Sequence, residues 1–353
     1  MDLKSFYNGK KVLVTGNTGF KGSWMSVFLD VLGAKAVGIG LEPETDPDLF
    51  TIAGLRESMK TYYTDIRNSD EIMRIFKEER PDIVIHMAAQ PLVIESYRNP
   101  AYTYDVNVMG TVNVCEAVRN TDSVRSFVNV TTDKVYRNNE WEYPYRENDV
   151  LDGFDPYSNS KSCSELVTAS YTRSFFKDMD IAVSTCRAGN VIGGGDYADN
   201  RIIPDCVRAA SSGKQIEVRN PNSVRPYQHV LEAVGFYLRL AMMQYEDHGL
   251  AGNYNIGPGE EDCLTTGQLC DIFCSKWKDG AKWGAIDYKG PHEANFLRLD
   301  TSRAKSVLSW SPAWRAEEAL EVTTQWYKAY YAGEDMPALT KRQISQYIER
   351  TGN

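Results

Sequence analysis

The chain has 353 residues, of which 42% are hydrophobic and 25% charged, which excludes a mainly disordered protein and leaves room for about two folded domains. Its net charge of −9 argues against nucleic acid or an anionic membrane as the main partner. No apolar run approaches the roughly 18 residues that a membrane span requires, and the first residues, MDLKSFYNGKK, lack the apolar core of a signal peptide.

The seven cysteines are scattered along the chain and are odd in number. This pattern favours a reducing compartment, so we expect the protein in the cytoplasm. Cys263, Cys270 and Cys274 have helix-like spacing, but no histidine lies close to them in the sequence. We therefore expect these thiols to pack in the interior and we expect no metal site.

The first half of the chain alternates short apolar runs with longer mixed segments. The sequence predicts strands at 11–15, 35–41, 82–88, 126–132 and 181–187, and helices at 22–32, 69–79, 103–119 and 157–176. Strands that are apolar without alternation, and that helices separate, predict an α/β fold with a parallel sheet covered on both faces.

The pattern changes after about residue 190. Pro, Gly and Asn become frequent, as in GNVIGGGD and NPNSVRPYQ, and the predicted helices have no regular strand partners. We expect a first domain at 1–188, to which some later segments return, and a smaller, irregular part at 189–353. The two parts are expected to enclose a cleft.

Three glycines follow the first predicted strand and precede a helix. Glycines in this place permit a tight turn and close approach of the backbone to a pyrophosphate, which the free N–H groups of the helix then bind. The turn predicts a dinucleotide site formed by Gly16, Asn17, Thr18, Gly19, Phe20, Lys21 and Gly22.

Acidic and small residues at later strand ends extend this site. Glu42, at the end of the second strand, can accept hydrogen bonds from the adenosine ribose, which favours NAD over NADP. It is also one of several acids in LEPETDPD, so a solvated carboxylate is the alternative. Asp65 can bond the adenine amine, and small Ala88 and Ala89 leave space for the cofactor, although each residue type is common in loops.

Tyr157 and Lys161 open a predicted helix, and their spacing of four places both side chains on one face. A phenol normally has a pKa of about 10. We expect the neighbouring ammonium and an oxidised nicotinamide to lower the pKa of Tyr157, so that it can take a proton from a sugar hydroxyl. A surface pair is the alternative, but it leaves the preceding strand end, Thr131 to Lys134, unexplained.

The glycine turn, the strand end TTD and the Y-x-x-x-K pair, in this order, resemble the extended short-chain dehydrogenases/reductases that act on nucleotide sugars. Within this family, the chain is most similar to the branch whose substrate is CDP-glucose. The resemblance covers nearly the whole length and is carried by GNTGFKGSW, HMAAQPLV, NVMGT, TTDKVY, DPYSNSK, RAGNVIGGGD, RPYQHV and KRQIS.

The resemblance implies an NAD-binding, Rossmann-type doubly wound parallel sheet and a smaller mixed α/β C-terminal substrate domain. It also implies further cofactor contacts from Ile66, Gln90, Asn107, Thr131, Tyr157 and Lys161. A homodimer built on helices such as 103–119 and 157–176 is expected on the same ground. His86 and His229 are expected to be structural.

The implied reaction is a 4,6-dehydration, which makes the protein a lyase. Tyr157 deprotonates the hydroxyl on the fourth carbon of the sugar while hydride passes from that carbon to NAD. The resulting ketone acidifies the proton on the fifth carbon, and water is eliminated from the fifth and sixth carbons. The hydride returns to the sixth carbon, which gives CDP-4-dehydro-6-deoxyglucose.

The strand end divides the elimination among three residues. By resemblance, Thr132 bonds the hydroxyl on the fourth carbon and Asp133 donates a proton to the leaving hydroxyl. Relatives that act on dTDP- or GDP-sugars carry a glutamate base at the next position, where this chain has Lys134. A lysine acts as a base only when its pKa falls well below about 10.4; otherwise Lys134 stabilises an enolate electrostatically. The sequence leaves both roles open.

Arginines of the C-terminal half are the candidates for the diphosphate of CDP-glucose, because a guanidinium binds phosphate in a bidentate way. The predicted substrate contacts are Gln90, Asn190, Arg201, Arg225 and His292. Surface charges, and a turn residue in the case of Asn190, are the alternatives.

Other functions share part of this pattern. A dehydratase of dTDP-glucose or GDP-mannose is the nearest, and a 4-epimerase would use Tyr157, Lys161 and NAD without needing Asp133 and Lys134. A non-catalytic NAD-binding protein is the alternative outside enzymes, and the presence of all these residues argues against it.

Overall fold

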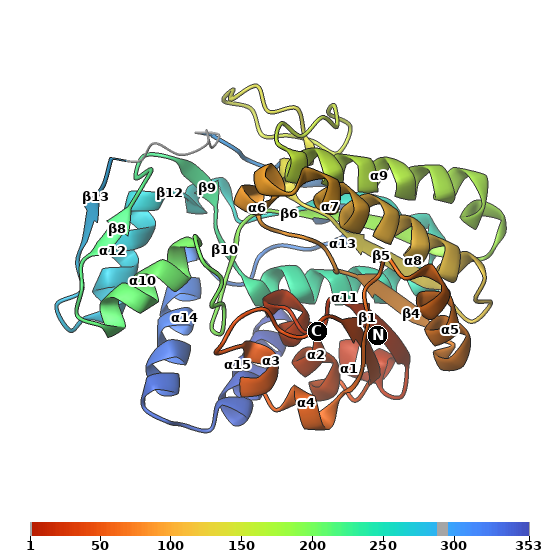
Figure 1. Cartoon of the computed structure of the whole chain (residues 1–353), viewed down its shortest axis with the longest axis horizontal. Helices are drawn as coiled ribbons and strands as arrows, with labels where there is room; N and C mark the ends of the chain where they lie inside the picture. Colours follow the sequence, from red (N-terminus) through yellow and green to blue (C-terminus); the bar gives the residue numbers. More distant parts are fainter. Residues whose placement is uncertain (1, 288–295, 353) are drawn as a thin grey trace.

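The computed structural model describes residues 2–287 and 296–352. Its centre is a seven-stranded sheet in which all neighbouring strands run parallel (Figure 1). In spatial order the strands are β11 (Asn253–Ile256), β6 (Ala182–Ala188), β5 (Ser126–Val130), β4 (Ile83–His86), β1 (Lys11–Thr15), β2 (Lys35–Gly40) and β3 (Lys60–Tyr63). The strand order reverses between β1 and β4, which confirms the predicted doubly wound Rossmann-type sheet.

The sequence located β1, β2, β4, β5 and β6 but missed the two edge strands, β3 and β11. Edge strands pair on one side only, so they need fewer apolar residues. The sequence of β3 is KTYY, and its side chains are partly exposed. In β11, the polar Asn255 is buried because its side chain accepts a hydrogen bond from the Tyr136 hydroxyl at 2.6 Å and donates to the Tyr145 carbonyl at 2.8 Å.

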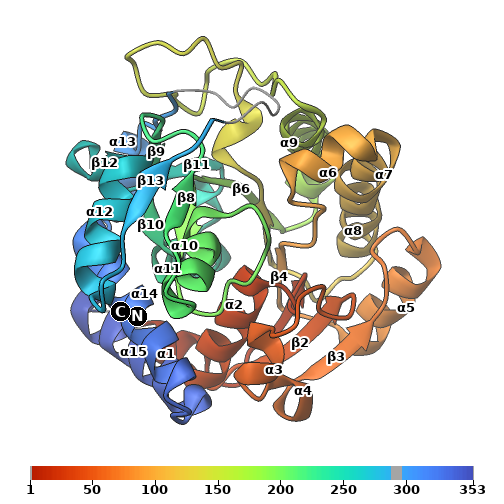
Figure 2. The same cartoon turned by 60° about the vertical axis from the view of Figure 1, so that its left-hand side comes forward.

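Helices cover both faces of the sheet (Figures 1 and 2). In β1, Leu13 packs on one face, while Val12 and Val14 pack on the other. This two-sided burial explains the apolar strands without alternation. The first face is covered by α5 (Ser69–Glu79), α8 (Gly110–Arg119) and α9 (Pro156–Ser174), and the second by α1 (Leu3–Tyr7), α2 (Phe20–Val31), α11 (Val230–Glu246) and α15 (Met336–Thr351).

The helix predicted at 103–119 is interrupted by a π-helical turn, Asp105–Met109, between α7 (Pro100–Tyr104) and α8. A π turn inserts one residue into a helix and redirects a side chain. Here the Asn107 amide donates to the Gln90 carbonyl at 3.1 Å and to the Ser160 hydroxyl at 2.9 Å. The helical segment predicted at 103–119 is confirmed, whereas the π turn within it was not predicted, because this tertiary contact has no signature in the local periodicity.

The C-terminal half contributes to both parts of the molecule. Strand β11 belongs to the sheet, α11 packs on it and α15 packs against α2, and the division at residue 188 stays a prediction. Three small sheets form beside it, pairing β8 with β13, β9 with β12 and β7 with β10. The elements outside the sheet and its covering helices include α3 (Leu49–Ile52), α4 (Leu55–Ser58), α6 (Val93–Arg98), β7 (Val191–Ile192), α10 (Ile202–Ser211), β8 (Ile216–Val218), β9 (Val224–Pro226), β10 (Gln228–His229), β12 (Cys263–Thr265), α12 (Thr266–Trp277), β13 (Trp283–Ala285), α13 (Ser302–Leu308) and α14 (Ala316–Tyr331).

No helix in the described part of the chain combines the length and apolarity that a membrane crossing needs.

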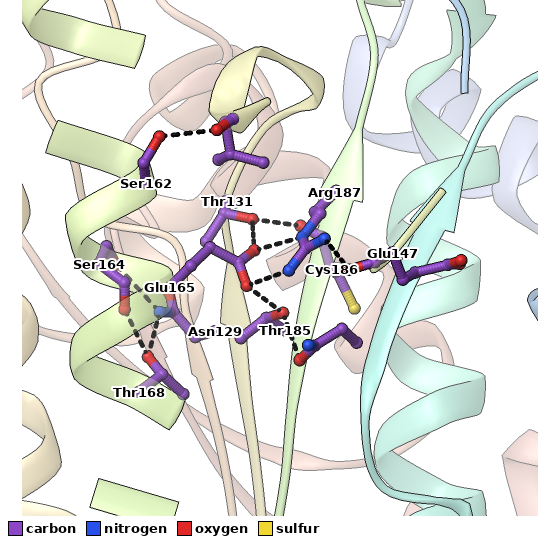
Figure 3. Close-up of polar contacts among 12 residues, drawn as sticks. Asn129, Thr131, Glu147, Ser162, Ser164, Glu165, Thr168, Thr185, Cys186 and Arg187 are labelled. Carbon is purple, nitrogen blue, oxygen red and sulfur yellow. Dashed lines mark hydrogen bonds and ion pairs between the residues drawn. The ribbon is translucent and has the colours of Figure 1, made fainter. Parts of the chain in front are cut away.

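A buried ion pair fixes α9 against the sheet (Figure 3). The carboxylate of Glu165 accepts from two nitrogens of Arg187 in β6, at 2.9 and 2.8 Å, and the two side chains are only 2% and 1% exposed. The same carboxylate accepts from the hydroxyls of Thr131, after β5, and Thr185 of β6. Arg187 also donates to the Tyr136 hydroxyl at 2.8 Å. This network joins one helix to two strand ends and to the loop that follows.

We predict that Arg187→Met destabilises the fold by about 3–5 kcal/mol, because it leaves the buried carboxylate of Glu165 without its cation. Urea unfolding followed by circular dichroism measures the change. Arg137→Met is the matched control: the Arg137–Asp152 pair, at 3.0 Å, is 60% and 48% exposed, so its loss should change stability by at most about 1 kcal/mol. An effect of Arg187→Met no larger than that of Arg137→Met would contradict the assignment.

Candidate active site

One large cavity, of 1170 Å³, runs along the carboxyl ends of the parallel strands. Its wall includes the residues that follow β1 to β6, among them Gly16, Thr64, Met87, Thr131 and Gly189. The opposite wall comes from the C-terminal half, at residues 195–205 and 217–227. Ligands of open α/β sheets bind in this place, because the strand order reverses there and leaves a crevice. The predicted cleft between the two halves of the chain is therefore present.

The glycine turn has the close backbone approaches that a pyrophosphate site needs. Gly16 has a φ of +76°, and a Cβ on it would lie 2.7 Å from the Ala88 nitrogen, while a Cβ on Gly22 would collide with the Gly16 carbonyl. Gly19 caps α2 without a side-chain hydrogen bond, so the first N–H groups of the helix are available to an anion. The geometry of the turn fits the pyrophosphate of a dinucleotide.

The rest of the cofactor wall is formed mostly as expected. Glu42, Asp65, Ile66 and both alanines of 88–89 line the cavity. One oxygen of Glu42 accepts from Arg56 at 2.8 Å in an exposed pair, which holds the carboxylate at the end of β2. This position suits a ribose hydroxyl as hydrogen-bond donor.

Four polar residues predicted to contact the cofactor use their side chains elsewhere. Asn17 and Asn107 do not line the cavity: the Asn17 amide donates to the Thr61 hydroxyl at 2.9 Å and ties the turn to β3, and Asn107 holds Gln90. Gln90 lines the cavity, but its amide donates to the Thr103 hydroxyl at 2.8 Å. Thr131 donates its hydroxyl to Glu165. The cofactor contacts predicted for Asn17 and Asn107 stay predictions, and the side-chain amides of both residues hold the backbone of the site in place.

The five predicted catalytic residues all line the cavity: Thr132, Asp133, Lys134, Tyr157 and Lys161. Helix α9 begins as expected, with Asp155 accepting from the Ser158 N–H at 3.0 Å and proline in the first turn. The short 3₁₀ helix η2 (Asp133–Val135) carries the acid and the lysine, and Thr132 caps it. Two elements therefore place the five side chains.

The expected lowering of the Tyr157 pKa by Lys161 was wrong. Burial raises the pKa of Tyr157 to about 12, although the hydrogen bond with Thr132 acts in the opposite direction. Lys161 donates to the Val130 carbonyl at 3.2 Å instead. At neutral pH the phenol is therefore protonated, and burial is the main reason.

Two lysines that line the cavity have pKa values below the ordinary value of a lysine. Burial and the nearby Lys21 lower the pKa of Lys161 to about 8. Burial and Arg201 lower the pKa of Lys21 to about 8 as well, and Lys21 lies 3.5 Å from the Tyr237 hydroxyl. Lys21 was predicted as part of the phosphate turn, but the sequence did not indicate that its charge reaches the catalytic end.

Asp133 has the surroundings of a proton donor. Its side chain is 1% exposed, and its Oδ1 accepts from the Thr132 hydroxyl at 3.0 Å and from Lys134 Nζ at 3.5 Å. Its Oδ2 is buried and has no hydrogen-bond partner among the described residues. A buried polar atom without a partner is costly, so this oxygen is arranged for a ligand group.

The predicted substrate residues are partly assembled. Asn190, Arg201 and Arg225 line the cavity, whereas His292 lies outside the described residues. Arg219 also lines the cavity, next to β8, and was missed because a strand of three residues is too short to show a period.

Both histidines predicted to be structural are buried within the protein. His86 bonds the hydroxyls of Thr15 and Thr111 at 2.7 and 3.2 Å, and burial lowers its pKa to about 3. His229 packs against Trp24 and Trp314, with a pKa also lowered to about 3 by burial. Neither imidazole is charged at neutral pH and neither lines the cavity, so the structural role of both histidines stays a prediction.

The sequence matches the protein family described as GDP-mannose 4,6 dehydratase over residues 13–323. It is 44% identical to the CDP-glucose 4,6-dehydratase of Salmonella typhimurium, over 99% of each chain. It is 27% identical to dTDP-glucose 4,6-dehydratase 1 of Escherichia coli, over 90% of this chain and 92% of the relative.

Solved structures with the same fold include UDP-glucose 4-epimerase of Thermotoga maritima, at a TM-score of 0.77 and 23% identity, covering 91% of this chain and 99% of that one. The dTDP-glucose 4,6-dehydratase of Bacillus anthracis, in complex with NAD, has a TM-score of 0.75 and 20% identity, and covers 93% of this chain and 100% of that one.

We predict that Lys161→Met stabilises the protein at pH 7. The folded-state pKa of about 8 lies below the ordinary 10.5, so the buried ammonium costs up to about 3 kcal/mol at pH 7, at about 1.4 kcal/mol per pKa unit. The lost bond to Val130 offsets about 1 kcal/mol of this gain. As the pH rises from 8 to 10.5 the lysine in the folded state loses its proton first, so wild type gains stability relative to the variant.

Urea unfolding at pH 7 and at pH 9.5 measures the difference between the two proteins. A variant that is less stable than wild type by the same amount at both values would contradict the lowered pKa.

Proposed function

The chain belongs to the nucleotide-sugar dehydratase family described as GDP-mannose 4,6 dehydratase, and from this we propose that it converts CDP-glucose to CDP-4-dehydro-6-deoxyglucose with NAD as cofactor. The observation that carries the proposal is the buried Asp133 with its unpartnered Oδ2, in the same cavity as the glycine turn and Tyr157. The choice of CDP-glucose is supported by the relative from Salmonella typhimurium.

NAD would supply the hydride acceptor for oxidation at the fourth carbon of the sugar and the hydride donor for reduction at the sixth. The glycine turn would hold its pyrophosphate at the N-terminus of α2, and Glu42 would hold the adenosine ribose. Lys161, beside Val130, would bond the second ribose.

Tyr157 takes the proton from the hydroxyl on the fourth carbon. The phenol is neutral at rest because burial raises its pKa to about 12, and positive charge brought in by the cofactor favours the phenolate. The hydrogen bond between Tyr157 and Thr132 keeps the phenol oxygen at the strand end, where the sugar hydroxyl joins the same chain of hydrogen bonds.

Asp133 and Lys134 carry out the elimination. The ketone at the fourth carbon acidifies the proton on the fifth, and Lys134 either removes this proton or stabilises the enolate that its removal leaves. Asp133 Oδ2 gives a proton to the hydroxyl of the sixth carbon, which leaves as water. Oδ1 keeps the hydrogen bonds from Thr132 and Lys134, so Oδ2, which has no hydrogen-bond partner among the described residues, is the oxygen left to carry the proton.

The diphosphate of the substrate needs cations on the opposite wall, and Arg201 and Arg225 line the cavity there. Arg201 donates to Asp196 at 3.2 Å, which fixes the guanidinium in place. Since a planar guanidinium can bind two phosphate oxygens at once, these arginines would orient the sugar toward Tyr157.

We predict that the purified protein with NAD removes one water from CDP-glucose, as seen by mass spectrometry of the sugar nucleotide. CDP-glucose should react far faster than dTDP-glucose, UDP-glucose or GDP-mannose. Asp133→Asn should slow the loss of water by about 10²–10⁴-fold, the usual contribution of a general acid. Unchanged mass with an inverted sugar configuration would identify an epimerase, and preference for another nucleotide would overturn the substrate.

A homodimer and a cytoplasmic location complete the proposal. Apolar side chains are exposed on three elements that pack together, namely Tyr97 of α6, Met109 of the π turn and Leu166 of α9, at 43%, 49% and 55%. A second copy would cover this surface. All the cysteines are free thiols, as in a reducing compartment.

We predict that Leu166→Glu, combined with Met109→Glu, converts a dimer to a monomer, because an interface core tolerates charge poorly. Sedimentation velocity measures the mass. Val307→Glu on α13, at a side chain that is 41% exposed, is the control and should leave the mass unchanged. A wild-type monomer, or a dimer that survives both substitutions, would contradict this interface.

A further inference from the structure

We propose that Asn190 is a positioning residue for Lys134, and that its neutral amide aligns the lysine without adding negative charge. The inference rests on the proposed function, since it concerns the elimination step. The substrate contact that the sequence predicted for the Asn190 side chain stays a separate prediction.

The contact is direct. Lys134 Nζ lies 3.4 Å from Asn190 Oδ1 and 3.5 Å from Asp133 Oδ1. An ammonium has only donors, so both oxygens act as acceptors and the amine is held between them. The Lys134 side chain is 31% exposed, whereas Asp133 is 1% exposed. The two acceptors therefore hold a half-exposed lysine beside the buried acid.

The position of Asn190 is set by a different part of the chain. Its carbonyl accepts from the Gln228 N–H at 3.1 Å, next to the pairing of β7 with β10. A Cβ on the preceding Gly189 would lie 2.6 Å from Pro226, so this backbone packs closely against β9. The segment after β6 thus supplies the second hydrogen-bond acceptor for Lys134, which follows β5.

The chemical type of each acceptor matters. A free lysine side chain loses rotamer entropy when it is fixed, so one contact of 3.5 Å holds it poorly. A second carboxylate would align it but would also favour the ammonium form. An amide aligns it as a neutral dipole. The other titratable side chains that line the cavity include Lys21, Asp133, Tyr136, Glu140, Asp155, Tyr157, Lys161 and Arg201.

The arrangement has a consequence for the reaction. The proton removed and the hydroxyl that leaves are on adjacent carbons of the sugar. Asp133 Oδ1 accepts from the lysine, while its Oδ2 is buried and has no hydrogen-bond partner among the described residues, so the acid and the amine lie side by side. Asn190 keeps the amine in this relation to the acid.

The first test is a double-mutant cycle on the NAD-loaded protein with CDP-glucose. We expect Asn190→Ala to lower kcat by roughly 10–100-fold, the effect of a misplaced catalytic group, and to leave KM within a few-fold. In a Lys134→Met background, Asn190→Ala should have no further effect. A raised KM with unchanged kcat, or effects that multiply, would overturn the proposal in favour of a substrate contact.

Asn190→Asp separates alignment from charge, because it keeps an acceptor oxygen and adds a negative charge. We expect kcat at high pH to recover most of what Asn190→Ala loses. If Lys134 is the base, the acid limb of the pH profile moves up by about one unit; if it is an electrostatic stabiliser, the limb stays in place. Loss of kcat equal to that of Asn190→Ala at every pH would contradict the positioning role. Asn120→Asp, on the exposed end of α8, is the matched charge control.

A measurement that needs no substrate tests the contact between Lys134 and Asn190 independently of the proposed reaction. Competitive acetylation followed by mass spectrometry compares the labelling of Lys134 with that of exposed Lys77 in wild type and in both Asn190 variants. We expect Asn190→Asp to slow the labelling of Lys134 by several-fold relative to Asn190→Ala. Equal labelling in all three proteins would refute the contact, whereas altered labelling in a protein that does not dehydrate CDP-glucose would refute only the proposed reaction.

Discussion

The ion pair between Glu165 and Arg187 determines how the catalytic elements stand relative to one another. Tyr157, Lys161 and Glu165 are four residues apart on one face of α9, so an anchor at Glu165 sets the height and rotation of the other two. Thr131, which bonds the same carboxylate, leads directly into Thr132 and Asp133. Arg187 leads into the turn that carries Asn190. One buried carboxylate therefore aligns the helix with both strand ends, and its burial requires all of these partners at once.

Several side chains that line the cavity are buried at a cost in free energy. Lys21 and Lys161 are cations whose pKa values fall to about 8, and Tyr157 is a phenol whose pKa rises to about 12. Burial is the main cause in all three cases, and the two lysines also repel each other. Asp133 adds an oxygen without a partner. Such groups are common at sites where ligands supply the missing charges and hydrogen bonds. Binding of substrate and cofactor would therefore offset the free energy that burying these groups costs.

Three asparagines show that a sequence motif does not predict the hydrogen-bond partner of an amide side chain. The sequence placed Asn17 and Asn107 among the cofactor contacts and Asn190 among the substrate contacts, because each belongs to a motif of the site. In the structure Asn17 ties the glycine turn to β3, Asn107 holds the backbone of Gln90, and Asn190 Oδ1 accepts from Lys134. An amide can donate or accept in any direction, so its position in a motif does not tell which neighbour it serves.

The sequence by itself determined the parallel sheet, the glycine turn and the cavity lining by Thr132, Asp133, Lys134, Tyr157 and Lys161, because these depend on short-range periodicity and on the rule that parallel strands end at one edge. Tertiary structure alone decided the edge strands β3 and β11, the π turn, the raised pKa of Tyr157 and the partner of Lys134. Each of these depends on burial, or on a contact between segments far apart in the chain, such as the 56 residues between Lys134 and Asn190. Local sequence carries no record of such distances.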